Sequence, residues 1–203
     1  MSNNIRRALS SLMTIVVLIS FAMGLTGCKK EEKSDLLSGK HHVEMDIEGY
    51  GTVCMELDAD TAPITVTNFI NLANQGFYNG LTFHRIIAGF MAQGGDPLGT
   101  GRGGSGSNIT GEFNINGIMN YISHNRGTVS MARSADSYNS GSSQFFICVA
   151  DCTSLDGQYA AFGRVTSGMD VVDAMVEATP VQDDNGTVLS EDQPVITEIR
   201  VID

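Results

Sequence analysis

The sequence predicts an all-β fold, in which an antiparallel sheet closes into a barrel that is capped by two helices. Short segments in which apolar and polar residues alternate recur along the chain, as expected of strands. The 23 glycines, set against 4 prolines, indicate many tight turns. Only two segments show helical periodicity, and they lie far apart. Strands and helices therefore cannot alternate as βαβ units, which favours the antiparallel barrel.

The first elements are expected to be a hairpin and a helix. Residues 43–57 contain two alternating runs around a turn rich in glycine, the pattern of a β-hairpin. Thr61 is predicted to be the N-cap of the helix that follows, with Pro63 in the first turn, where its missing N–H does no harm. Gly76 is expected to end this helix.

The remainder of the chain is expected to form five strands, a loop and a second helix. Residues 94–111 are rich in glycine and are predicted to be loop. Apolar residues recur at helical spacing between about 168 and 177, which predicts the second helix. The five strands are expected at residues 81–87, 128–132, 144–149, 159–165 and 195–202.

Alternation on the strand at 81–87 makes a prediction about side-chain direction. In a regular strand, Phe83 and Arg85 share one face and His84 takes the other. His84 has no plausible nucleophile near it in sequence. It is therefore interpreted as a structural histidine that makes hydrogen bonds.

The charge balance limits the class of partner. The formal net charge is -11, and residues 28–203 hold 10 basic against 23 acidic side chains. Binding to nucleic acid needs a basic surface, so nucleic acid is not expected as a partner. A neutral or basic polypeptide is favoured instead, and the protein is expected to be a monomer.

The first 28 residues have the features of a targeting segment. Arg6 and Arg7 precede an apolar run that ends in a small residue and Cys28. This end resembles the bacterial lipobox, which implies a signal peptide at 1–27, attachment of lipid such as palmitate to Cys28, and a flexible tether at 28–41. The alternative is an uncleaved transmembrane anchor. Both interpretations place residues 42–203, the expected domain, outside the cytoplasm at a bacterial membrane.

Several other patterns carry little chemistry. Cys54, Cys148 and Cys152 are an odd number, which is a poor disulfide framework, and they are predicted to be free thiols. The CxxxC spacing of the last two has no histidine partners and is a weak zinc signal. Residues 99–104 match GxGxxG as a string, but no strand precedes and no helix follows them, so nucleotide binding is not expected.

The stretch at 83–96 is the most informative part of the chain. It places Arg85, Phe90, Met91 and Gln93 within nine residues, without a nucleophile or a cluster of metal ligands. Such residues can hold a peptide and donate a hydrogen bond, but they are poorly suited to breaking a covalent bond. They indicate conformational chemistry on a bound polypeptide.

Five segments in the same order resemble the cyclophilin-type peptidyl-prolyl isomerases. They are Phe83–Asp96, Gly127–Arg133, Gly141–Ile147, Leu155–Gly157 and Phe162–Met169. The resemblance runs over 42–203. It implies an eight-stranded barrel with two helices, isomerase activity on X–Pro bonds, and no metal or organic cofactor. Together with the targeting segment, it implies that the substrates are exported proteins whose folding is assisted.

The resemblance also implies roles for individual residues. Arg85 matches the catalytic arginine. Residues matched to the substrate groove are Phe90, Met91, Gln93, Ala132, Gln144, Phe146, Leu155 and Tyr159.

Two positions depart from the family pattern. Ser154 replaces the tryptophan of members that bind cyclosporin tightly, and Tyr159 stands where a histidine is common. Ser154 argues against tight cyclosporin binding, whereas Tyr159 still offers an aromatic wall and a hydroxyl.

Three alternatives remain open at this point. Ser154 and Tyr159 are also compatible with a module that binds proline-containing segments without turnover. A membrane-tethered adhesion protein is a further class. Taken singly, Phe90, Met91 and Phe146 fit an ordinary hydrophobic core better than a pocket, and the pocket is favoured only when they are taken together with Arg85 and Gln93.

Overall fold

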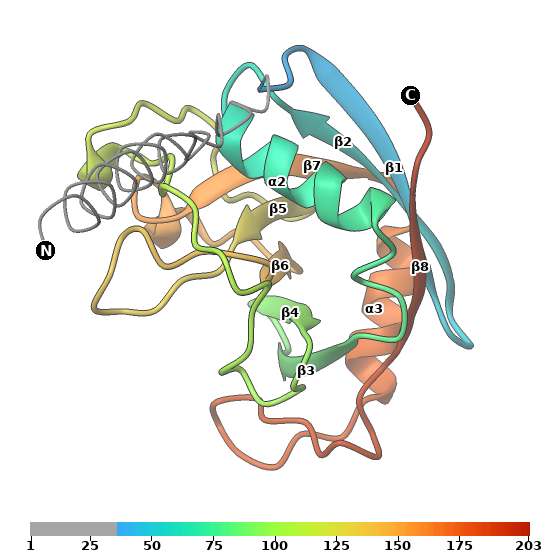
Figure 1. Ribbon diagram of the computed structural model, residues 1–203. Coiled ribbons are helices and arrows are strands. Elements are labelled where there is room, and N and C mark those ends of the chain that lie inside the picture. The colour runs from blue at the N-terminus through green and yellow to red at the C-terminus, as the bar shows by residue number, and fades with distance from the viewer. Residues whose placement is uncertain (1–35) are drawn as a thin grey trace, which may run out of the picture. The chain divides into compact units, whose positions relative to one another are not determined.

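The computed structural model describes residues 36–203, in which eight strands form a single curled sheet (Figure 1). The strands are β1 (Lys40–Ile47), β2 (Gly51–Asp58), β3 (Thr82–Ile87), β4 (Met91–Asp96), β5 (Thr128–Met131), β6 (Phe145–Cys148), β7 (Ala160–Ser167) and β8 (Ile196–Val201). The helices are α2 (Pro63–Asn74) and α3 (Met169–Ala178), with 3-10 turns η1 (Asn114–Asn116) and η2 (Thr153–Leu155).

The predicted closed barrel is wrong in one respect, because the sheet is an open, curled half-barrel. Its order is β3-β4-β6-β5-β7-β2-β1-β8, and every neighbouring pair is antiparallel. The edge strands β3 and β8 form no ladder with each other within residues 36–203. The two edges meet at one end alone within these residues, where an isolated bridge joins Thr82 to Val195 and Phe83 N–H donates to the Pro194 carbonyl at 2.9 Å. Beside this bridge, Ile196 N–H donates to the Leu81 carbonyl at 2.7 Å. The all-β class, the eight strands and the two helices are confirmed.

The segment between α3 and β8 explains why the sheet stays open. It runs along the outer edge of β3, where Ile86 N–H donates to the Gly186 carbonyl at 2.8 Å and Val188 N–H donates to the His84 carbonyl at 3.1 Å. Figure 1 shows this orange-red segment beside β3. The backbone N–H and C=O groups on this edge of β3, which a strand closing the barrel would need as partners, are thus already hydrogen-bonded.

The main hydrophobic core lies on the concave side of the sheet and is closed by the helices. α2 packs against β2, β7 and β8, and α3 packs against β2. Phe69 from α2 contacts Tyr78, Phe145 and Phe162, with ring centroids 4.9 to 5.4 Å apart. Val172 from α3 is also fully buried in this core. Burial of large aromatic rings of this kind is a main source of stability.

The N-terminus of α2 is capped by a residue distant in sequence. The Glu112 carboxylate accepts hydrogen bonds from Ile64 N–H at 3.0 Å and Thr65 N–H at 2.8 Å. The predicted N-cap, Thr61, instead donates its hydroxyl to Asp58 at 2.9 Å. A carboxylate at this end satisfies free N–H groups and favours the helix dipole.

β4 is a strand that the sequence did not reveal. The sequence Met-Ala-Gln-Gly-Gly-Asp has few residues of high β propensity, and its second half was predicted to be loop. It is held by pairing on both sides, with β3 and with β6. Gly95 makes this pairing possible, because a Cβ there would lie 2.6 Å from the Ser143 carbonyl oxygen. Tertiary contacts therefore override local preference.

The other expected elements are present with boundaries shifted by at most a few residues, including the hairpin β1–β2 and the helix α3. The expected signal peptide at 1–27 and the lipid site Cys28 lie outside the described residues, as does most of the tether at 28–41. Over residues 36–203, no helix is both long and apolar enough to cross a membrane.

Candidate functional site

The strand register brings residues from four strands into one row across the sheet. Arg85 on β3 is paired with Gln93 on β4, Gln93 with Phe146 on β6, and Phe146 with Ser130 on β5. Cross-strand partners project to the same face of a sheet. Their neighbours Phe145 and Ile147 belong to the main core. The row therefore lies on the face turned away from that core.

A β-bulge places Arg85 on this outer face. Phe83 pairs with Gly94 and Arg85 pairs with Gln93, so His84 is an extra residue on β3. Phe83 is fully buried in the main core, whereas Arg85 is half-buried at the outer hollow. The prediction that Phe83 and Arg85 share a face was wrong, because it assumed strict alternation.

His84 is buried, as a structural role requires, but its expected hydrogen bonds are not present. Neither ring nitrogen has a hydrogen-bond partner among residues 36–203. Burial lowers the pKa of His84, which Asp96 nearby opposes. The ring is therefore neutral near pH 7.

The Arg85 guanidinium is held at one edge of the hollow by three contacts. Its Nε donates to the Asn185 carbonyl at 2.8 Å, and its Nη1 lies 3.4 Å from Gln93 Oε1 and 3.7 Å from Met91 Sδ. Within residues 36–203 its Nη2 has no acceptor. Burial lowers the pKa of Arg85, but a guanidinium stays protonated wherever proteins are folded. The group thus offers a fixed charge and a free donor.

An apolar hollow of about 210 Å³ lies beside this guanidinium. Met91 and Phe146 are almost fully buried beneath it and pack with Cys148 and Cys152 into a second hydrophobic cluster, separate from the main core. Hollows of this kind suit a small apolar ring. The residues that line it are Arg85, Phe90, Met91, Gln93, Ala132, Arg133, Phe146, Leu155 and Tyr159.

His124 supports the Phe146 ring from behind and was not noticed in the sequence. The two rings are stacked, with centroids 6.0 Å apart and an interplanar angle of 16°. His124 Nδ1 lies 2.9 Å from Asp156 and its Nε2 lies 3.0 Å from Ser130 Oγ. Burial lowers the pKa of His124, and Asp156 opposes this effect. No signal local to His124 indicates this contact, because it joins separate segments.

Arg133 lines the hollow itself and was also missed by sequence reasoning. Its guanidinium carbon lies 4.7 Å from the ring centroid of Tyr159 and 5.1 Å from that of Tyr138, a cation–π geometry. Its Nε donates to the Gln158 carbonyl at 3.0 Å. Tyr159 also meets Phe146 edge to face, with centroids 5.8 Å apart. The Tyr159 hydroxyl has no hydrogen-bond partner among the described residues.

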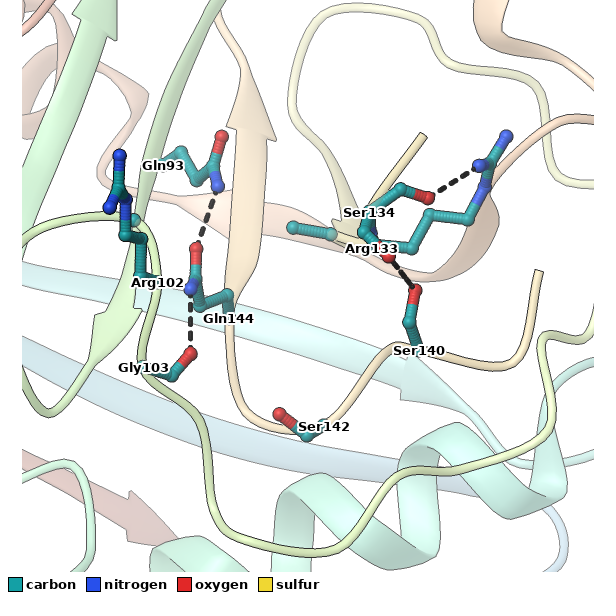
Figure 2. A pocket seen from close by; sticks show the side chains of 10 residues that line it. Gln93, Arg102, Gly103, Arg133, Ser134, Ser140, Ser142 and Gln144 are labelled. Carbon is teal, nitrogen blue, oxygen red and sulfur yellow. Dashed lines mark hydrogen bonds between the residues drawn. The ribbon is translucent and has the colours of Figure 1, made fainter. Parts of the chain in front are cut away.

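A chain of amides connects the apolar hollow to a second hollow of about 400 Å³ (Figure 2). Gln93 Nε2 donates to Gln144 Oε1 at 2.8 Å, and Gln144 Nε2 donates to the Gly103 carbonyl at 2.8 Å. Gln93 and Ala132 line both hollows. The two hollows are therefore adjacent parts of one groove.

The structure thus brings together all nine site residues predicted from the sequence. Eight line the apolar hollow or both hollows, and Gln144 lines the second one. Ser154, the position that departs from the family pattern, is exposed in η2 next to Leu155.

None of the three cysteines of the described residues lines the hollows, although Cys148 and Cys152 pack beneath the first one. Cys54, Cys148 and Cys152 are free thiols, as predicted. Burial raises the pKa of Cys148, which disfavours its reactive thiolate. No group of three or more potential metal ligands occurs within residues 36–203.

The chain is similar to known proteins over most of its length. The family described as cyclophilin type peptidyl-prolyl cis-trans isomerase/CLD matches residues 42–201. A peptidyl-prolyl cis-trans isomerase of Helicobacter pylori is 45% identical over 134 residues, which cover 65% of this chain and 78% of the relative. A peptidyl-prolyl cis-trans isomerase-like 1 of Aspergillus fumigatus is 44% identical over 155 residues, 75% of this chain and 87% of the relative.

Solved structures show the same likeness. The crystal structure of a cyclophilin type peptidyl-prolyl cis-trans isomerase of Cryptosporidium parvum has a TM-score of 0.70 and 31% identity. It covers 81% of this chain and 99% of its own. A second crystal structure of that protein, in the presence of the dipeptide Ala-Pro, has a TM-score of 0.69.

Proposed function

Because the chain belongs to the cyclophilin-type peptidyl-prolyl cis-trans isomerases, we propose that Arg85 drives rotation about X–Pro bonds of exported polypeptides held in the groove. Isomerase activity follows from the family. The roles of individual residues, the mechanism and the clients are the proposal. Its main support is the Arg85 guanidinium, which is fixed beside an apolar hollow large enough for a small ring. One guanidinium nitrogen has no acceptor among residues 36–203 and can donate to a substrate.

The arginine acts on a feature that only the transition state has. Rotation requires that amide resonance be broken, and it takes about 10–100 s at 25 °C without a catalyst. In the twisted state the proline nitrogen becomes pyramidal and gains a lone pair, to which Arg85 donates. The planar ground state hardly offers this lone pair, so binding is stronger in the transition state. Reaching about a millisecond needs roughly 5.5–7 kcal/mol of such stabilisation.

The apolar hollow fixes the proline ring while the rest of the peptide turns. Phe146 and Met91 form its floor, and Phe90, Leu155 and Tyr159 form its walls. Burial of the ring against them supplies binding energy of about 25 cal/mol per Å².

The amides beside the hollow hold the peptide backbone. Gln93 and Gln144 are oriented by their mutual hydrogen bond and by Gly103, and Ala132 forms the facing wall. An oriented amide can bind a peptide group without a reorganisation cost at the moment of rotation. Each step is rotation about a bond, so no metal or cofactor is required.

Substitution of Arg85 tests this mechanism. In a protease-coupled assay on a proline peptide, Arg85→Ala is expected to lower kcat/KM by about 10²–10³, as removal of an oriented donor does. Arg85→Lys keeps the charge but loses the fork held by Asn185 and Gln93, and we expect it to restore little activity. Full activity of Arg85→Ala would exclude the role. NMR exchange spectroscopy on a bound peptide reports the same rotation without a protease.

We further propose that the clients are exported proteins near a bacterial membrane and that the protein acts as a monomer. The location is supported by the basic pair Arg6–Arg7, the apolar run and the small residues before Cys28. Cys28→Ser is expected to abolish labelling by palmitate and to move the protein from the membrane fraction to the supernatant. Retention of the label in Cys28→Ser would exclude lipidation at this residue.

A further inference from the structure

The basic side chains of the described residues fall into two groups. Residues 36–203 hold seven Lys and Arg against 20 Asp and Glu. Lys40, Arg126, Arg164 and Arg200 each form an ion pair with one or more carboxylates, at 2.5 to 3.3 Å. The other three form no ion pair with any described residue, and all three line the groove. They are Arg85, Arg102 and Arg133.

Two of these arginines border the second hollow. Figure 2 shows Arg102 beside Gln93 and Gln144 on one side of the hollow, with Arg133 on the opposite side. Ser140 and Ser142 complete the lining, and no acidic residue takes part in it. Residues 36–203 hold nearly three acids for each base, and yet every charged residue that lines this groove is positive.

The two arginines are held to different degrees. Arg133 donates to the Gln158 and Ser134 carbonyls and stacks on Tyr159, so its position is fixed but its charge is not neutralised. The Arg102 side chain is exposed and makes no hydrogen bond to any described residue. Its five N–H donors therefore remain available for a planar anion.

The nearest acidic group on the Arg102 loop does not compete for it. The Asp96 carboxylate accepts hydrogen bonds from Leu98, Thr100 and Gly101 N–H and is buried. These bonds outweigh the effect of burial and lower the pKa of Asp96.

We propose that the second hollow is a subsite for an acidic side chain, Asp or Glu, located close to the proline in the substrate polypeptide. The proposal rests on the proposed function, because the neighbouring apolar hollow is taken to bind the proline. Arg102 forms the ion pair and Arg133 adds a fixed positive field. The positive charge of the groove thereby favours polypeptides with an acidic residue near the proline, although the negative net charge of the whole chain would disfavour acidic polypeptides.

Peptide pairs that differ by one charge test this subsite. In each pair, Glu or Gln occupies one of the two positions before the proline or the position after it. We expect kcat/KM for Glu to exceed that for Gln by about threefold or more at one position, the size of an exposed ion pair. The ratio should fall toward one as salt is raised to about 0.5 M.

Two exposed arginines make a matched set of variants. Arg102→Gln is expected to bring the Glu/Gln ratio close to one. Arg164→Gln removes the same charge from β7, where Arg164 pairs with Glu56 at 3.3 Å, and should leave the ratio unchanged. A ratio of one in the unaltered protein at every position, or a ratio that survives Arg102→Gln, would overturn the proposal.

The readouts separate this proposal from the proposed function. If the Gln peptides are turned over and the Glu/Gln ratio of kcat/KM is one, the isomerase function stands and the acidic subsite is excluded. If no peptide is turned over, the Kd values of the Glu and Gln peptides, measured by NMR titration, still report the preference. Equal Kd values would then exclude it.

Discussion

Tyr159 shows how a departure from the family pattern is accommodated. Its ring lies between the Arg133 guanidinium, 4.7 Å from the centroid, and the edge of Phe146. Its hydroxyl has no hydrogen-bond partner among residues 36–203. The ring therefore contributes a wall and the hydroxyl contributes little in the free protein.

Two substitutions separate the ring from the hydroxyl. Tyr159→Phe keeps both aromatic contacts, so kcat/KM should stay within about twofold. Tyr159→Ala removes contacts of about 0.5–1.5 kcal/mol each and opens the hollow, so kcat/KM should fall about tenfold, mainly through KM. Steady-state kinetics on one proline peptide decides this. A large loss in Tyr159→Phe would instead show that the hydroxyl binds substrate.

At the scale of elements, the turn after α3 positions the Arg85 side chain. The Asp183 carboxylate accepts from Thr187 N–H and Oγ1, each at 3.0 Å, which closes the turn. The turn presents the Asn185 carbonyl to Arg85 Nε. It also occupies the edge of β3 that a closing strand would use. One short segment therefore both leaves the sheet open and orients the guanidinium.

Gly186 is the position where this turn is most sensitive. Its φ is +77°, and a Cβ there would lie only 2.1 Å from the Ile86 carbonyl oxygen. Gly186→Ala should reduce the free energy of unfolding by clearly more than the about 1–2 kcal/mol of a positive φ alone. Because the turn must shift, kcat/KM should also fall about tenfold or more.

Gly49→Ala is the matched control for this substitution. Gly49 has a φ of +76° and open space around its Cβ position. For Gly49→Ala, urea denaturation should show a loss in the free energy of unfolding that comes from the positive φ alone, and kcat/KM should not change. Equal losses of stability and activity in both variants would refute the role of the β3 contact.

At the scale of the whole molecule, two buried histidines make stability depend on pH. Burial lowers the pKa of both His84 and His124 below the ordinary value of 6.5. The unfolded chain then binds more protons than the folded one below about pH 6.5, so protonation favours unfolding. Their contribution is fully present above that pH and is lost as the pH falls.

The free energy of unfolding is expected to change with pH by up to about 1.4 kcal/mol per pH unit for each histidine. Urea denaturation at about pH 7.5, 6.5 and 5.5, at constant ionic strength, measures the free energy of unfolding. His84→Gln should reduce the slope between the last two values. A free energy of unfolding that stays constant over this range would contradict the prediction.

Much of the fold and the composition of the site followed from the sequence alone. Alternation indicated the hairpin β1–β2 and most later strands, because a half-buried strand repeats every second residue. The order of motifs around Arg85, Phe146 and Leu155 indicated the family. Both kinds of information are read along the chain and require no knowledge of which distant segments contact one another.

Only the tertiary structure decided the remaining features. The edge of β3 is occupied by a segment about 100 residues away, which kept the barrel open. The bulge at His84 set the face of Arg85, and pairing on both sides made β4 a strand. The positions of the carboxylates in the fold leave Arg102 and Arg133 without an ion pair among residues 36–203. Each of these depends on register and contacts between distant segments, which local periodicity does not encode.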